Sequence, residues 1–154
     1  MTSLEFWKDY LKSVNKKEDE ALYSGELVFE DSGFTGQTQL SLVLSGAKTA
    51  VFTPLEAVEI NRERPPVPGE VYIVLDSQDE PRCIIELTDV NILPFNEIPW
   101  DLAKRDGENE NLEDWRSKMR ELIQDEGDIC GFQLREDMKI VAESFRVIYK
   151  KAGC

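Results

Sequence analysis

Lys48 is the residue of this chain whose sequence context is best suited to chemistry. It lies between residues 40–45, where apolar side chains recur at helical spacing, and the strand-like run 49–53, and Gly46 offers the helix stop between them. An ammonium group held between a helix and a strand is tethered by regular structure on both sides, so it can be aimed into a cavity. The pattern makes Lys48 a candidate site residue, with a solvated turn lysine as the alternative.

The absence of histidine limits the catalytic chemistry of the chain. None of its 154 residues is a histidine, which excludes Ser-His-Asp and Cys-His catalysis and histidine-based zinc hydrolysis in their usual forms. An acid or base must therefore be a carboxylate, a lysine, a tyrosine or a cysteine. The cysteines Cys83, Cys130 and Cys154 are scattered and form no Cys-x-x-Cys pair, so we expect reduced thiols. We expect neither a metal site nor a cofactor.

The formal net charge of −13 works against the attraction to phosphate that supplies much of the affinity of proteins for nucleic acids. The 18 basic residues are also spread along the chain, which argues against a DNA partner and leaves room for one local groove. No apolar run approaches the length of a membrane span, and residues 1–9 lack a signal-peptide core. We therefore expect a cytoplasmic protein, a monomer or weak dimer, without a membrane partner.

Hydrophobic periodicity predicts a single α+β domain over residues 1–154. Helices are expected at 3–15, where residues 2–5 fit a capping box, and at 35–45, 54–60, 101–105 and 112–124. Strands are expected at 49–53, at 139–149 and in a hairpin of 70–75 and 82–90 that continues through 92–95. The apolar segment 21–29 is left open as to type. These elements indicate a small, curved, mostly antiparallel or barrel-like sheet with helices at its rim.

Several segments carry a resemblance to a known family. They are Phe6-Trp7, residues 29–32, residues 42–50, Pro68-Gly69, and residues 80–86, 103–115 and 145–149. In order and spacing they resemble the ASCH domain of the PUA-like superfamily, and especially its longer bacterial members, over nearly the whole chain. The resemblance implies a PUA-like β-barrel on which the N-terminal helix in residues 1–20 packs. It also implies a cleft between the barrel and its helices, with the Gly-x-Lys turn at the mouth.

The resemblance also implies a set of site residues. In the bacterial branch that acts as an acetylcytidine amidohydrolase, the pattern is Gly-x-Lys-x-x-Thr plus a glutamate from the acidic loop before a helix. Gly46, Lys48 and Glu108 match that pattern, whereas Val51 stands in place of the threonine. In that scheme the lysine activates the threonine hydroxyl and the glutamate moves protons. Valine keeps the shape of threonine and lacks its hydroxyl, so Val51 removes the nucleophile of that scheme and leaves the packing intact.

Two neighbouring threonines offer a replacement for the missing hydroxyl. Thr49 and Thr53 share the strand parity of Val51, so either can present a hydroxyl with a changed reach. A second polar group is also missing, because Met119 stands where longer family members carry a histidine four residues past the helix tryptophan Trp115.

The remaining candidates have structural alternatives. Trp115 is expected either to stack on a base or, more in keeping with its apolar helix face, to belong to the core. Asp31 and Ser32 are expected to cap the second helix or to shape the floor of the cleft. Glu108 belongs to a run of acidic residues, which is typical of a solvated loop and helix start. Glu86 fits the polar face of a half-exposed strand, with an inward acid as the alternative.

Taken together, these patterns lead us to expect a cleft that recognises a nucleoside, a nucleotide or an exposed RNA base. Weak amidohydrolase activity on an acylated nucleoside is compatible with Lys48 as activator and Glu108 as proton carrier. The alternative is an RNA-binding module of PUA-like type without catalysis, and a third class is a regulatory interaction protein without a ligand.

Overall fold

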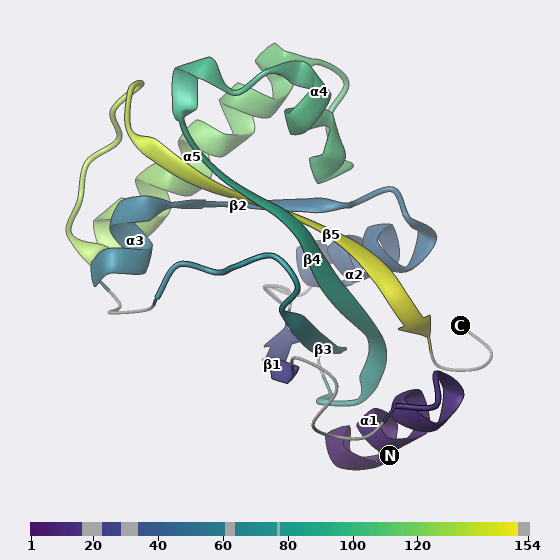
Figure 1. Ribbon diagram of the computed structural model, residues 1–154. Helices are drawn as coiled ribbons and strands as arrows, with labels where there is room; N and C mark the ends of the chain where they lie inside the picture. Colours follow the sequence, from purple (N-terminus) through teal and green to yellow (C-terminus); the bar gives the residue numbers. More distant parts are fainter. Residues whose placement is uncertain (17–22, 29–33, 61–63, 77, 151–154) are drawn as a thin grey trace. The chain divides into compact units, whose positions relative to one another are not determined.

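The computed structural model (Figure 1) describes residues 1–16, 23–28, 34–60, 64–76 and 78–150, and residues 34–38 by their backbone alone. The chain forms two compact units. The first contains residues 1–47, 68–88 and 145–154, and the second contains residues 48–67 and 89–144. Two strands, residues 81–94 and 139–150, have residues in both units.

The strands form one five-stranded mixed sheet, which confirms the predicted α+β class. In sheet order they are β1 (Tyr23–Val28), β3 (Val71–Leu75), β4 (Pro81–Pro94), β5 (Lys139–Lys150) and β2 (Ala50–Pro54). Strand β1 is parallel to β3, whereas β3 with β4 and β2 with β5 are antiparallel. The barrel implied by the resemblance is not closed, because β1 and β2 are the edge strands of the sheet as far as the structure describes it.

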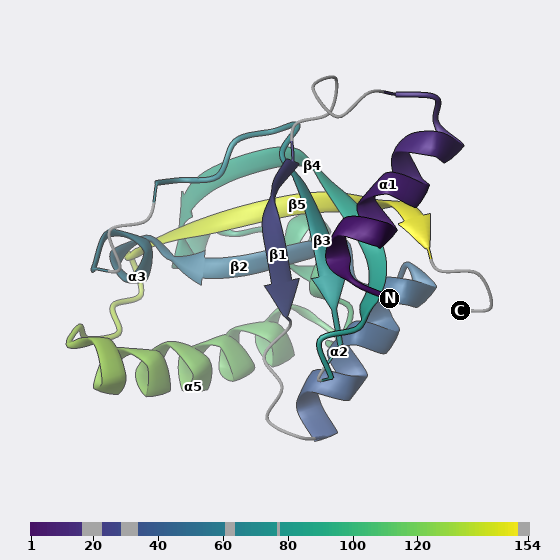
Figure 2. The same ribbon diagram turned by 90° about the horizontal axis from the view of Figure 1, so that it is seen from below.

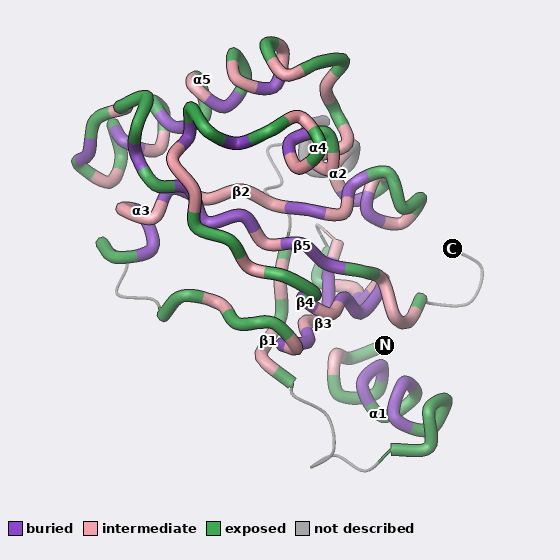
Figure 3. Tube along the Cα trace, turned by 45° about the horizontal axis from the view of Figure 1, so that its top comes forward, coloured by how far each residue is buried: buried purple, intermediate pink, exposed green. Residues whose placement is uncertain are grey.

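In the first unit, helix α1 (Ser3–Ser13) packs its apolar face against the sheet. The N–H of Glu5 donates to Thr2 Oγ1 at 3.2 Å, as the predicted capping box requires. Figure 3 shows buried and exposed residues alternating along this helix, as expected for one amphipathic face. The buried side chains of α1 are Phe6, Trp7, Tyr10 and Leu11, and they join Val71, Ile73, Leu75 and Ile84 in one cluster.

The segment left open by its sequence pattern, residues 21–29, contains strand β1, which lies beside β3 in Figure 2. Helix α2 (Phe34–Ser45) begins and ends close to the predicted bounds. The predicted hairpin is also present, and β4 continues to Pro94, as expected for residues 92–95.

The second unit places β2 beside one half of β5, and Figure 2 shows the two strands side by side. Its helices and short 3₁₀ turns are α3 (Leu55–Ile60), η2 (Phe95–Glu97), α4 (Trp100–Ala103), η3 (Lys104–Asp106) and α5 (Leu112–Cys130). Asn111 caps α5, because its Oδ1 accepts from the N–H of Asp114 at 2.9 Å. The helix runs past the predicted end at residue 124 and stops at Gly131, whose φ of 92° is left-handed.

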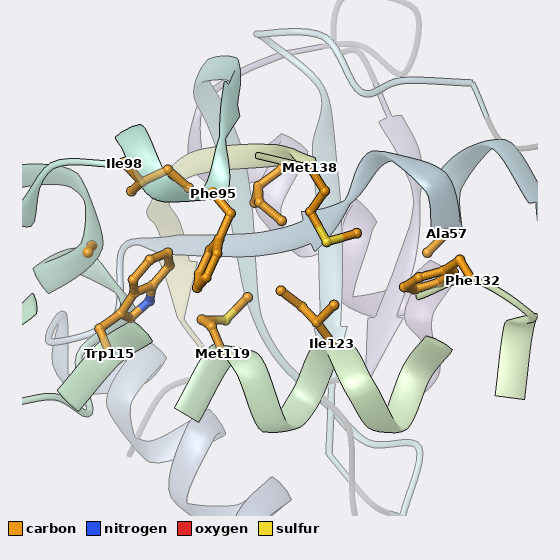
Figure 4. Close-up of a cluster of buried hydrophobic side chains, with 10 residues drawn as sticks. Ala57, Phe95, Ile98, Trp115, Met119, Ile123, Phe132 and Met138 are labelled. Atoms are coloured by element: carbon orange, nitrogen blue, oxygen red, sulfur yellow. The ribbon is translucent and has the colours of Figure 1, made fainter. Parts of the chain in front are cut away.

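The core of the second unit lies along one face of α5. In Figure 4 the side chains of Trp115, Met119 and Ile123 point from the helix toward Phe95 and Met138. Met119 is 4% exposed, so the side chain at this position fills the core. Within the described residues, none of the helices has the length and apolar character needed to span a bilayer.

Candidate functional site

Lys48 lies two residues before β2 and forms an ion pair with Asp106, the last residue of η3. Its Nζ donates to Asp106 Oδ1 and also faces the backbone carbonyl oxygen of Asp106 at 3.3 Å. The Lys48 side chain is 4% exposed and that of Asp106 is 15% exposed, so the two charges meet largely out of water. Lys48 is therefore not the solvated turn lysine that its context left as the alternative.

Trp115 holds the second oxygen of the same carboxylate. Its indole Nε1 donates to Asp106 Oδ2 at 3.1 Å. The ring packs against Phe52 and Phe95, with centroid separations of 5.0 and 5.7 Å, and the residue is fully buried. Trp115 thus belongs to the core and orients Asp106. A fully buried ring has no open face for stacking on a base.

Arg105, which precedes Asp106, is fixed by two hydroxyl groups. Its Nε donates to Thr49 Oγ1 at 3.0 Å and its Nη1 donates to Ser144 Oγ at 2.9 Å. The N–H of Thr49 donates in turn to the carbonyl oxygen of Arg105 at 2.8 Å. Ser144 is 1% exposed, so the contact to β5 is sheltered from water. These bonds place the start of β2, turn η3 and strand β5 in one polar cluster, which we call the Lys48 cluster: Lys48, Thr49, Arg105, Asp106, Trp115 and Ser144.

Val51 lies on the other face of the sheet from the Trp115 ring. In the β2–β5 ladder Val51 pairs with Glu143, and Phe52 pairs with Ala142. Because successive strand residues point to opposite faces, Val51 and Thr53 share the face of Glu143, while Phe52 packs against Trp115 on the opposite face. A threonine at position 51 would therefore carry its hydroxyl away from the oxygens of Asp106 that Lys48 and Trp115 bind.

Glu108 is exposed, and the loop around it is tied down through backbone contacts. Lys118 donates to the carbonyl oxygen of Glu108 at 3.3 Å and pairs with Asp114 at 3.4 Å. The N–H of Glu110 also donates to Asp114, and this hydrogen bond, with the smaller effect of Lys118, lowers the pKa of the Asp114 carboxyl. The carboxylate beside Lys48 is thus that of Asp106, two residues before the glutamate that matches the family pattern.

The other predicted site residues lie elsewhere or outside the description. Gly46 is exposed and adopts a φ of 85°, a left-handed conformation that suits glycine at a helix end. Asp31 and Ser32 lie outside the described residues. Glu86 is half-buried on β4 and pairs with Arg146 at 2.7 Å, as a polar strand face would. No cluster of potential metal ligands occurs among the described side chains.

The chemistry of the Lys48 cluster is that of hydrogen-bond donation. A lysine ammonium has three N–H groups and a guanidinium has five, and within the described part of the chain Lys48 gives two contacts to Asp106 and Arg105 gives two to hydroxyls. The remaining donors suit a ligand rich in carbonyl or phosphate oxygens. The cluster holds no hydroxyl that Lys48 contacts, so it is better suited to recognition than to nucleophilic attack.

Sequence reasoning missed Arg105, Asp106 and Ser144 as members of this cluster. Asp106 had a local sequence signal, the Asp-Gly pair that it forms with Gly107, which is typical of a turn. In the structure Gly107 ends the 3₁₀ turn with a left-handed φ of 87°. Ser144 had a weaker one, as a polar residue on the buried face of a strand that is otherwise apolar there. Arg105 had none, since its two side-chain partners come from distant strand segments.

Comparisons with known proteins agree with this architecture. The family model of the ASCH domain matches residues 25–149. A solved ASCH domain from Lactobacillus crispatus JV V101 is similar with a TM-score of 0.86 and 29% identity, and the match covers 96% of this chain and 94% of that one. Protein EF3133 from Enterococcus faecalis V583 is similar with a TM-score of 0.83 and 28% identity, covering 94% and 86% of the two chains. No match is found among curated proteins.

The family match covers far more than half of the chain, and both solved structures share its fold over most of their length. The α+β fold with a five-stranded mixed sheet is therefore that of ASCH domains, and a PUA-like fold is supported. On this evidence the chain belongs to the ASCH domain family.

Proposed function

We propose that this ASCH domain binds a small nucleoside-like ligand, that is a nucleoside, a nucleotide or an exposed base, through the Lys48 cluster. Membership of the ASCH domain family supports the proposal. In addition, Lys48 stands where the Gly-x-Lys pattern of the amidohydrolase branch has its lysine. The observation that carries it is the sheltered ion pair of Lys48 and Asp106, whose carboxylate is held from the other side by the buried indole of Trp115.

The energetics of this ion pair favour a functional role. Removing two charges from water is expensive, and a sheltered ion pair often contributes no more stability than well-packed apolar side chains would. The pair lies next to an apolar core, where such side chains would be easy to accommodate. An ammonium held in this way is pre-oriented, so it can donate to a ligand carbonyl or phosphate oxygen without first being ordered.

Efficient catalysis has less support than binding. Amide hydrolysis without a metal or histidine needs an activated nucleophile, a proton carrier and donors for the developing oxyanion. Lys48 and Arg105 supply donors, but position 51 has no hydroxyl and Glu108 is exposed away from the Lys48 contacts. We therefore propose recognition, with at most weak hydrolysis of an acylated nucleoside.

The proposal is tested by calorimetric titration of the chain with the four ribonucleosides, their 5′-monophosphates, acetylcytidine and a short single-stranded RNA. We expect at least one mononucleoside compound to bind, and binding to be lost in Lys48→Met. The matched control is Lys104→Met, which removes the same charge from a side chain that is 54% exposed.

Two results would contradict the proposal. Equal binding by Lys48→Met and Lys104→Met would show that the Lys48 cluster does not bind the ligand. Binding of the RNA alone, with an affinity that falls steeply as salt is raised, would replace the small-ligand function by that of an RNA-binding module.

A further inference from the structure

Arg105 differs in its contacts from five other arginines of the described residues. Five arginines form ion pairs with carboxylates in the described structure: Arg82, Arg116, Arg120, Arg135 and Arg146. Arg105, by contrast, donates to the hydroxyls of Thr49 and Ser144. In a chain that carries 31 acidic residues and 18 basic ones, a carboxylate partner would be easy to supply. Because its side-chain partners are neutral, the positive charge of this half-buried guanidinium is not neutralised by a contact and is available to an anionic ligand.

The hydroxyl contacts also fix the plane of the guanidinium. Thr49 holds Nε from one side and the buried Ser144 holds Nη1 from another. The Nη2 group has no acceptor among the described residues. With its plane set, the guanidinium keeps both N–H groups of Nη2 and the second N–H of Nη1, a pair of donor nitrogens that can bind a planar or tetrahedral oxyanion in a fork geometry.

The charges in direct contact within the Lys48 cluster do not balance. Lys48 and Arg105 are cations, whereas Asp106 is the carboxylate in contact with Lys48. Because Thr49 and Ser144 are neutral, direct contacts leave one positive charge without a counter-charge. The cluster therefore favours a ligand that carries a negative charge close to hydrogen-bond acceptors.

We propose that Arg105 binds the phosphate of a nucleotide, so that the ligand of the Lys48 cluster is a nucleoside monophosphate in preference to a free nucleoside. This inference rests on the proposed function and narrows it to a ligand class. Lys48 contacts a carbonyl or phosphate oxygen, and Arg105 supplies the specificity for the charged group. Phosphate on a small molecule fits better than the backbone of a long nucleic acid, because the net charge of −13 repels a polyanion.

The test compares each ribonucleoside with its 5′-monophosphate, and with inorganic phosphate alone, by calorimetric titration of the native chain. We expect the best monophosphate to bind at least about tenfold more tightly than its nucleoside, as a charge-assisted pair would give. In Arg105→Gln this ratio should fall to near one, and in Arg105→Lys it should be intermediate, since lysine keeps the charge and loses the fork.

Two controls separate this effect from others. Arg146→Gln removes an equal charge from an exposed side chain that pairs with Glu86, and it should leave the ratio unchanged. Ser144→Ala keeps the charge of Arg105 and removes one of its two hydroxyl contacts, so it should reduce the ratio partly. A folded state equal to the native one by circular dichroism is required of each variant.

The outcomes separate the inference from the function on which it rests. Equal affinity for nucleosides and monophosphates, or a ratio that survives in Arg105→Gln, overturns the phosphate assignment and leaves the proposed function standing. Binding of inorganic phosphate as tight as that of any monophosphate overturns the nucleotide assignment, because the base would then contribute nothing. Failure of every nucleoside and monophosphate to bind overturns both.

Discussion

Thr49 and Arg105 are joined by two hydrogen bonds that run in opposite directions. The N–H of Thr49 donates to the carbonyl oxygen of Arg105 at 2.8 Å, and the Nε of Arg105 donates to Thr49 Oγ1 at 3.0 Å. Each residue is a chain neighbour of one member of the Lys48–Asp106 ion pair. The segment before β2 and turn η3 are therefore held together by backbone as well as side-chain contacts. These contacts place the side chains of Lys48 and Asp106 next to each other.

The first prediction concerns the stability contributed by this ion pair. Lys48→Met should lower the free energy of unfolding by about 3–5 kcal/mol, because it leaves the Asp106 carboxylate sheltered and unpaired. Asp106→Asn should also destabilise the fold. The double variant should lose less than the sum of the two, by about 0.5–3 kcal/mol. Urea denaturation followed by tryptophan fluorescence measures each value. Strict additivity would show that the two side chains do not interact.

Trp115→Phe tests the indole contact. The variant keeps an aromatic ring in the core and removes the donor to Asp106 Oδ2, so it should cost about 1–3 kcal/mol for an acceptor left without its partner. Trp100→Phe is the comparison, since Trp100 is a half-buried tryptophan at the edge of the same core. Equal losses in the two variants would mean that ring size, and not the hydrogen bond, sets the cost.

Val51→Thr tests whether the missing family hydroxyl can be restored. Since Val51 shares the sheet face of Glu143, the new hydroxyl should lie away from Asp106, and hydrolysis of acetylcytidine should not rise above that of the native chain. Chromatographic detection of released cytidine measures the rate, with Thr53→Val as a variant on the same strand face. Clear turnover by Val51→Thr would contradict the assignment of recognition without efficient catalysis.

Asp76 gives a prediction for pH dependence. Burial acts to raise the pKa of its carboxyl, but hydrogen bonds from the N–H groups of Glu80 and Gln78, together with Arg82, hold the pKa below its ordinary value of 3.8. Because the folded-state pKa lies below the unfolded one, this carboxylate stabilises the fold above about pH 4 and the contribution is lost as the pH falls through the folded-state pKa.

Asp76→Asn should therefore lower Tm at pH 7 and flatten the decline of Tm in acid. Thermal unfolding followed by circular dichroism from pH 7 down to about pH 2.5 covers the window. Asp79→Asn is the control, since Asp79 is an exposed aspartate in the same turn, with a φ of 61° that asparagine tolerates. Parallel Tm curves for Asp76→Asn and the native chain would contradict the prediction.

The helices and most strands were predictable because their signals are local. Thr2 begins α1 by a capping contact that the sequence pattern contains. Strand β1 was not identified, because its half-exposed residues include Gly25 and its place is set by parallel pairing with the distant strand β3. The pairing of strands far apart in sequence depends on contacts that no short pattern encodes.

In the candidate site, too, the residue with local sequence signals was predictable and its distant partners were not. Lys48 was predictable from the helix stop and strand start on either side of it. Its partner was not, since spacing to helix α5 pointed to Glu108, whereas the bonds between Thr49 and Arg105 bring Asp106 to the lysine. Ser144 needed the register between β2 and β5 before its place could be known.

The most direct test of ligand binding at the Lys48 cluster is an NMR titration that follows the indole N–H signal of Trp115. The chain has three tryptophans, and Trp115→Phe assigns the signal that reports on Asp106. When the tightest-binding nucleoside or nucleoside monophosphate is added, we predict a saturable shift of this signal, larger than those of Trp7 and Trp100 and absent in Lys48→Met. A Trp115 signal that stays in place at saturating ligand, or that shifts equally in Lys48→Met, would contradict this prediction.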